Sequence, residues 1–129
     1  MEKTILIIED DENISKALDV RLQARGYKVL TAFDAIQGMQ KATGTLPDVI
    51  LLDITMPGGN GLSLAERLKA SANTKAIPII FLTASQQSDL REKAMALGAT
   101  AYFEKPYDFD YLLAALRAAS EHPDVRLAI

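Results

Sequence analysis

Short apolar runs of strand length alternate five times with stretches of helical periodicity, and this alternation limits the fold more than any other feature of the chain. The runs are rich in β-branched and aromatic residues, and the firmest of them are continuously apolar. Strands of that kind are buried on both faces, which favours a parallel sheet with helices on each side. The expected strands lie at residues 4–8, 27–30, 49–52, 79–82 and, with a weaker signal, 101–103.

The segments between these runs have the spacing of amphipathic helices. In the first segment, Ile14, Leu18 and Leu22 fall on one helical face, and Gly26 stands where a C-cap is expected. Asp108 is a suitable N-cap for the last helix. The helices after the first are expected at about residues 34–42, 62–72, 88–97 and 108–120.

This order of elements, with short connections and right-handed crossovers, predicts an open, doubly wound α/β domain with five parallel strands, the (βα)5 flavodoxin-like architecture. The chain has 129 residues and a mass of 14.1 kDa. That length is enough for one core and too short for a barrel of eight βα units. We expect one domain over residues 1–120 and a C-terminal tail, or the start of a linker, over residues 121–129.

The charge and the cysteine count exclude several classes of function. A net charge of −3 and a pI of about 5.1 give no long-range attraction to nucleic acid or to an anionic membrane. Because the chain has no cysteine, disulfides, thiolate nucleophiles and cysteine-based zinc sites are excluded. No apolar stretch approaches the ~20 residues of a membrane span, and the N-terminal apolar run is too short for a signal peptide. A cytoplasmic protein is the expectation.

Charged and hydroxyl side chains stand where the expected strands end. Glu9 and Asp10 follow the first strand, Asp53 the third and Thr83 the fourth, and Lys105 comes shortly after the fifth. In open α/β sheets the ligand site lies beyond the carboxyl ends of the strands. A single acid at such a place is more often a helix cap or a turn residue. Three converging acids, however, repel one another unless a cation holds them together.

The types of side chain indicate a metal and a phosphate. Glu9, Asp10, Asp53 and Lys105 carry a summed formal charge of −2, which a divalent cation would balance. Oxygen ligands without His or Cys favour Mg²⁺, with Mn²⁺ as an alternative. Thr83 and Lys105 fit as phosphate ligands, one through a hydroxyl and one through an ammonium. An acceptor carboxylate, a metal and an opposing cation are the parts that phosphoryl transfer needs.

Four fragments now identify a family. "ILIIEDDE", "DVILLDITMPGGNG", "PIIFLTA" and "AYFEKPY" occur in this order and with ordinary family spacing. Together they resemble the receiver domain of two-component response regulators, the CheY-like fold, over about residues 3–120. The resemblance implies the strand order 2-1-3-4-5. It also implies a signalling phosphoacceptor, which acts only on its own phosphorylation and dephosphorylation and is not an enzyme in the usual sense.

The resemblance further implies roles for the acidic residues. Asp53 would accept a phosphoryl group from the phosphohistidine of a sensor histidine kinase or a phosphotransfer protein. Asp10 would bind Mg²⁺ directly, and Glu9 would do so directly or through water. Asp53 and the backbone carbonyl of Thr55 would complete the metal ligands from the protein.

It implies a switch as well. Thr83 would turn its hydroxyl towards the phosphate, Lys105 would pair with a phosphoryl oxygen, and Tyr102 would rotate inward as Thr83 moves. The Lys105–Pro106 bond is expected to be cis. The face formed by the fourth helix, the fifth strand and the fifth helix would then change and act on an output protein, a fused output domain or a second copy of the chain.

Two alternatives stay open at this stage. An Asp-nucleophile phosphohydrolase usually carries a second acid two residues after the nucleophile, where this chain has Thr55. A degenerate receiver would serve only as a phosphorylation-independent protein-binding module, but such domains tend to lose the residues that are all present here. Neither Thr55 nor Ser85 is an acid or an amide that orients water strongly, so we expect the phosphorylated form to lose its phosphate slowly.

Overall fold

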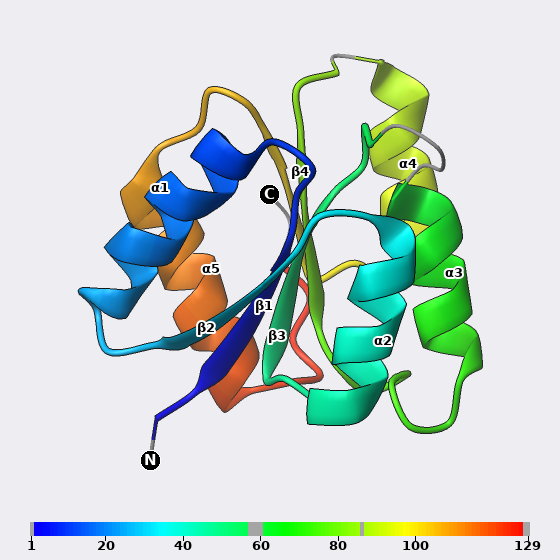
Figure 1. The fold of residues 1–129 in the computed structure, drawn as a ribbon. Coiled ribbons are helices and arrows are strands. Elements are labelled where there is room, and N and C mark those ends of the chain that lie inside the picture. Colours follow the sequence, from blue (N-terminus) through cyan, green and yellow to red (C-terminus); the bar gives the residue numbers. More distant parts are fainter. Residues whose placement is uncertain (1, 57–60, 86, 128–129) are drawn as a thin grey trace.

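A computed structural model describes residues 2–56, 61–85 and 87–127 of the chain (Figure 1). Five parallel strands form one sheet in the order β2-β1-β3-β4-β5, which confirms the expected architecture and strand order. Each strand is found where the sequence predicted it, within two residues at either end. The strands are β1 (Thr4–Ile8), β2 (Lys28–Ala32), β3 (Val49–Asp53), β4 (Ile79–Thr83) and β5 (Ala101–Glu104).

Helices cover both faces of the sheet. Two of them, α1 and α5, lie on one face, and α2, α3 and α4 lie on the other (Figure 1). The central strands β1, β3 and β4 are almost entirely buried between these layers, as their continuously apolar sequences predicted. The helices are α1 (Glu12–Gln23), α2 (Ala35–Thr45), α3 (Gly61–Ala70), α4 (Ser88–Ala96) and α5 (Phe109–Glu121).

Aspartates fix the starts of three helices. The carboxylate of Asp11 accepts hydrogen bonds from the first backbone amides of α1. Asp34 does the same for α2, and Asp108 caps α5 as predicted, accepting from the Asp110 N–H at 2.8 Å. These side chains satisfy amides that have no partner within the helix. The caps set where each helix begins after the strand or loop before it.

Two glycines end helices in the left-handed conformation. Gly26 (φ +91°) follows α1 and Gly98 (φ +87°) follows α4. In each case the next residue donates a backbone hydrogen bond five residues back, Tyr27 to Leu22 at 3.2 Å and Ala99 to Ala94 at 3.2 Å. This is the Schellman pattern, which a residue without a β-carbon adopts without strain. The helical residues of α1 themselves end at Gln23, slightly before the predicted cap.

The C-terminal segment packs back onto the domain as far as it is described. The Leu127 N–H donates to the Thr100 carbonyl at 2.8 Å, and the Leu127 side chain contacts the core beneath α1 and α5. The boundary at residue 120 stays a prediction, because α5 runs to Glu121 and the following residues lie against the same domain. Within the described ranges, no helix has both the length and the apolar character that crossing a membrane requires.

Candidate functional site

The strand register brings the predicted site residues to one edge of the sheet. Asp53 at the end of β3 stands beside Leu82 in β4, and Thr83 stands beside Glu104 in β5. Glu9 directly follows β1, whose last residue pairs with Leu52. Parallel strands in this register end at the same level, so side chains far apart in the sequence meet there. The structure thus brings together the residues that the sequence placed at the strand ends.

Three carboxylates form the centre of the site. Glu9 and Asp53 are each only 4% exposed, whereas Asp10 is open to solvent. Oxygen atoms from all three lie within 4.8 Å of one another. The backbone N–H of Asp11 also donates to Glu9 Oε2 at 3.2 Å, a contact that the sequence could not reveal because it depends only on the path of the backbone.

Lys105 supplies the opposing charge. Its Nζ lies 2.8 Å from Glu9 Oε1 and 3.7 Å from Asp53 Oδ2. The Lys105–Pro106 bond is cis, as predicted. Burial alone would lower the pKa of Lys105, but the hydrogen bond to Glu9 and the charges of Asp53 and Glu9 outweigh burial and raise it. Lys105 is therefore held as a cation inside the cluster.

The two oxygens of the Asp53 carboxylate have different contacts. Oδ1 accepts hydrogen bonds from the Thr55 N–H at 3.0 Å and from the Thr55 hydroxyl at 3.1 Å. Oδ2 faces Lys105. The Gly61 N–H donates to the Ile54 carbonyl at 2.8 Å, and a β-carbon on Gly61 would lie 2.4 Å from the Asp53 carbonyl oxygen. Close backbone approach at Gly61 therefore needs glycine. Residues 57–60 lie outside the described ranges.

Thr83 and Tyr102 lie on the face of the sheet that α2, α3 and α4 cover. Thr83 is fully buried, and its hydroxyl oxygen accepts from the Ser85 N–H at 3.0 Å. Tyr102 is 2% exposed, its ring lies 5.5 Å from the Arg91 guanidinium, and its buried hydroxyl has no hydrogen-bond partner among the described residues. Burial and the charge of Glu104 raise the pKa of the Tyr102 phenol. The Tyr102 ring thus lies buried in the core cluster on this face of the sheet.

The electrostatics of the cluster fit a divalent cation. Desolvation is the first cause that raises the pKa of the solvent-exposed Asp10 carboxyl, followed by a hydrogen bond to Glu9 and the charges of Glu9 and Asp11. Desolvation and the neighbouring acids both disfavour the ionised form of this carboxyl. The donors are all oxygens, and with Lys105 the group sums to −2. This donor set suits Mg²⁺ or Mn²⁺ and does not suit zinc.

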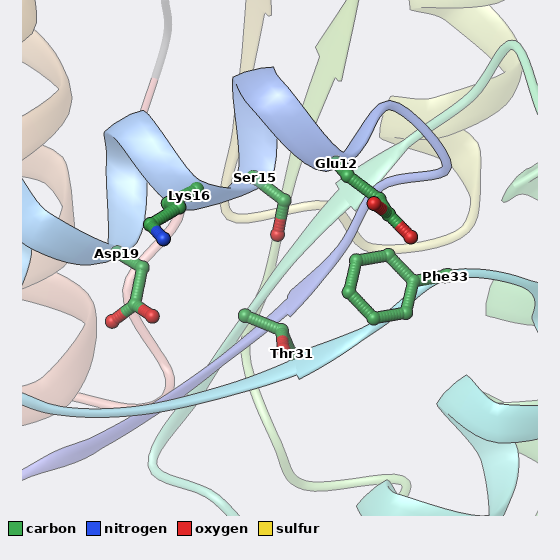
Figure 2. Close-up of a pocket in the computed structure, with 6 residues that line it drawn as sticks. All are labelled: Glu12, Ser15, Lys16, Asp19, Thr31 and Phe33. Atoms are coloured by element: carbon green, nitrogen blue, oxygen red, sulfur yellow. The ribbon is translucent and has the colours of Figure 1, made fainter.

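A separate groove lies beside this site, between α1 and β2 (Figure 2). Its volume is about 370 Å³, and α1 and the end of β2 form its two walls. The Ser15 hydroxyl points into it, although Ser15 is 1% exposed and has no hydrogen-bond partner among the described residues. Sequence reasoning did not single out this serine, whose only signal is a polar residue three positions before Leu18 on the core face of α1. The groove is lined by Glu12, Ser15, Lys16, Asp19, Thr31 and Phe33.

A parallel, doubly wound sheet with an acid cluster, a threonine and a lysine at the ends of its strands defines a narrow class of protein. The family model of the response regulator receiver domain matches residues 5–117. The chain therefore belongs to the response regulator receiver domain family, the CheY-like signalling modules of two-component systems.

Curated relatives agree with this assignment. The chain is 40% identical over 116 residues to the phosphate regulon transcriptional regulatory protein PhoB of Pseudomonas aeruginosa, covering 90% of this chain and 51% of that protein. It is 37% identical over 120 residues to the DNA-binding dual master transcriptional regulator RpaA of Synechocystis, covering 93% and 50%. The chain thus spans about half the length of the curated relatives it matches.

Solved structures are similar over almost the whole chain. A CheY-like response regulator receiver domain protein from Methanospirillum hungatei superposes with a TM-score of 0.89 at 26% identity, covering 96% of this chain and 98% of that one. The chemotaxis response regulator CheY4 of Vibrio cholerae superposes with a TM-score of 0.83 at 29% identity, covering 91% and 98%.

Proposed function

We propose that this receiver domain takes up a phosphoryl group on Asp53 and passes the signal on through a change of surface. The observation that carries the proposal is the environment of the Asp53 carboxylate. It is buried at the end of β3, next to two further acids, and Lys105 lies 3.7 Å from its Oδ2. A buried carboxylate among like charges is costly unless the site binds cationic or electron-poor groups.

The reaction needs little from the protein beyond position and charge. An Asp53 oxygen attacks the phosphorus of a phosphohistidine on the donor protein, forming an O–P bond. The N–P bond breaks, and its electron pair returns to the donor imidazole. Lys105 then moves from its contact with Glu9 to pair with a phosphoryl oxygen, and the Thr83 hydroxyl, which accepts from the Ser85 N–H, donates its own proton to another.

Glu9, Asp10, Asp53 and the backbone carbonyl of Thr55 would hold Mg²⁺, or Mn²⁺ in its place. The carboxylates fit this role because their oxygens are within 4.8 Å of one another and their charge is not fully compensated by Lys105. When bound, the cation neutralises the charge that builds up on the phosphoryl oxygens.

The phosphorylation signal would be transmitted by the surface that α4, β5 and α5 form. Movement of the Thr83 side chain towards the phosphate would leave space on the face of the sheet where Tyr102 is buried. That change would shift the equilibrium of the α4-β5-α5 surface towards one of its conformations. On α5, Ala115 packs into the core, and Tyr111, 69% exposed, is the large apolar side chain that remains outside among the described residues. We propose a sensor histidine kinase or phosphotransfer protein as donor. The signal would then act on an output protein, a fused output domain or a second copy of the chain.

The domain limits belong to the same proposal. Residues 1–120 would act as the receiver, and residues 121–129 as a tail or the start of a linker. The two curated relatives, whose names describe transcriptional regulation and DNA binding, are about twice as long as the matched region. They support an output unit outside the receiver, while this chain itself has the charge of a protein without direct nucleic-acid contact.

One labelling experiment tests the proposal. The protein is incubated with acetyl phosphate and Mg²⁺, and intact-mass and peptide analysis locate the adduct. We expect one phosphoryl group per chain on Asp53, lost in Asp53→Ala and after chelation of Mg²⁺. The matched control is Asp19→Asn, an exposed acid outside the site that accepts a hydrogen bond from Gln23, and it should label like the wild type.

The outcomes separate the alternatives. Continuous release of inorganic phosphate without a stable adduct would identify a phosphohydrolase with an Asp nucleophile. A folded, Mg²⁺-binding protein that never labels would identify a degenerate receiver that acts only as a binding module. Either result would overturn the phosphoacceptor proposal.

A further inference from the structure

A second cavity lies at the opposite ends of the strands from the acid cluster. Pro78 stands just before β4 and Thr100 just before β5, so the cavity is at the amino ends of these strands. The end of α3, the loop after it and the C-terminal segment complete its walls. Its volume is about 230 Å³, and it is lined by Lys69, Lys75, Ala76, Pro78, Gly98, Thr100, Pro123, Asp124, Val125 and Arg126.

The charge of this lining is opposite to that of the chain. Lys69, Lys75 and Arg126 contribute three positive charges and Asp124 one negative charge, a formal sum of +2 in a chain whose net charge is −3. Over residues 2–56, 61–85 and 87–127, neither Lys69 nor Arg126 has a carboxylate within 4.0 Å. The cations of the cavity are therefore not neutralised by neighbours in the described structure.

Lys69 is fixed in place as part of the cavity wall. Its Nζ donates to the Lys75 carbonyl at 3.3 Å and to the Ile77 carbonyl at 3.2 Å. An ammonium has three N–H donors, so one remains for a ligand. Burial and the positive charge of Arg126 together lower the pKa of Lys69, as is typical of a cation without a counter-ion.

Arg126 is positioned by the backbone around it. The next residue, Leu127, is tied to Thr100 by a hydrogen bond and packs against the core. Gly98 lacks a side chain where the guanidinium approaches, and a β-carbon there would be 3.1 Å from Arg126 Nη1. The left-handed turn after α4 thus leaves room for Arg126 beside Lys69.

We propose that this cavity binds a small dianionic phosphate group between the Lys69 ammonium and the Arg126 guanidinium. A dianion matches the summed charge of the lining, and the volume admits a phosphate with a few further atoms. Arginine and lysine donate charge-assisted hydrogen bonds to phosphate oxygens, and an arginine can do so with two N–H groups at once. The ligand is either inorganic phosphate or a small phosphate monoester. This site is independent of phosphorylation at Asp53.

Titration followed by amide NMR tests the site. The full chain is titrated with inorganic phosphate and, separately, with glycerol phosphate, with EDTA present so that no metal bridges phosphate to the acid cluster. Sodium chloride at matched ionic strength is the reference. We expect saturating shifts of the Gly98, Thr100 and Leu127 amides and none at Ile54 beside the acceptor. Equal affinities would assign the site to the phosphate group, and tighter binding of the ester would show that its carbon atoms contact the wall.

Variants give the decisive comparison. Arg126→Gln, on an exposed segment, and Lys69→Met should each weaken phosphate binding roughly tenfold or more, the effect of losing a charge-assisted hydrogen bond. Lys93→Met, which removes an exposed lysine paired with Asp89 on α4, should bind like the wild type. Shifts that never saturate, that sodium chloride reproduces, or that Lys93→Met weakens as much as Arg126→Gln does, would overturn the proposal.

Discussion

Replacement of Gly61 by alanine tests whether the acceptor strand depends on close backbone contact. The added β-carbon would lie 2.4 Å from the Asp53 carbonyl oxygen and 2.9 Å from the Ile54 α-carbon. Real β-carbons essentially never come closer than 3.0 Å, so the first contact falls short by 0.6 Å. Both neighbours are backbone atoms of the acceptor strand and its exit, and they cannot rotate away as a side chain would.

Overpacking and helix propensity change the free energy of unfolding in opposite directions. Overpacking of a close-packed site costs about 1–3 kcal/mol. Alanine is favoured over glycine by about 1 kcal/mol in the interior of a helix, and by less at the first residue of α3, where Gly61 lies. We therefore expect Gly61→Ala to lower the free energy of unfolding by about 1–2 kcal/mol.

Gly44 provides a control of opposite sign. It lies in the last turn of α2 with ordinary helical geometry, and a β-carbon there would have no atom within 4 Å. Gly44→Ala should raise the free energy of unfolding by about 0.5–1 kcal/mol, because only the helix-propensity term acts.

Urea unfolding followed by circular dichroism measures both variants. We expect the two midpoints to move in opposite directions from the wild type, with similar slopes. The reasoning is refuted if Gly61→Ala is as stable as the wild type, since the backbone would then have room for the methyl group. It is equally refuted if both variants lose the same stability, because the cost would then be unrelated to the approach of Gly61 to Asp53.

Four further predictions concern buried polar groups, the metal and the phosphate. Ser15→Ala should leave stability unchanged or raise it by up to about 1 kcal/mol, because its buried hydroxyl has no partner in the described part of the chain. Thr74→Val should cost about 1 kcal/mol, because the Thr74 hydroxyl donates to a buried carbonyl at 2.6 Å. Urea unfolding would contradict this if Ser15→Ala cost as much as Thr74→Val. Mg²⁺ at a hundred times its dissociation constant should stabilise the wild type by about 2.7 kcal/mol in thermal unfolding, an effect that Asp10→Ala abolishes. Lys105→Met should tighten Mg²⁺ binding, since it takes the formal charge of the cluster from −2 to −3; weaker binding would argue against a purely electrostatic role. The phosphorylated protein should keep its phosphate for minutes or longer without a phosphatase, because Thr55 beside the acceptor offers no carboxylate or amide to orient water, and a half-life of seconds would contradict this.

Much of the fold followed from local pattern. Continuously apolar runs such as residues 49–52 predicted strands buried on both faces, and the sheet places them in its centre. Asp108 and Gly26 marked a helix start and a helix end through local capping chemistry, which needs no distant partner. Boundaries moved by one or two residues where the deciding hydrogen bond came from elsewhere in the chain. The β2 strand, for instance, extends to Ala32, whose carbonyl accepts from the Glu9 N–H.

The candidate site was predictable in its members but not in its contacts. Placing Glu9, Asp53 and Lys105 together required only that parallel strands end at one edge of a sheet. That Lys105 rests closer to Glu9 than to Asp53 could not be read from the sequence, because these residues are 96 and 52 positions away from it and the difference of about an ångström depends on packing. The same holds for Tyr102, which is buried and whose hydroxyl has no partner within the described ranges.

The sequence by itself determined the order of elements, the two-sided burial of the central strands and the set of acids at the strand ends. These depend on hydrophobic periodicity and capping, which act between neighbours along the chain. Only the tertiary structure decided that Gly61 must lack a side chain because of the Asp53 backbone. It alone decided that Ser15 faces a groove, and that Arg126 meets Lys69 at the far edge of the sheet. Such contacts depend on distances between distant segments, and those distances exist only once the sheet register and the helix packing are fixed.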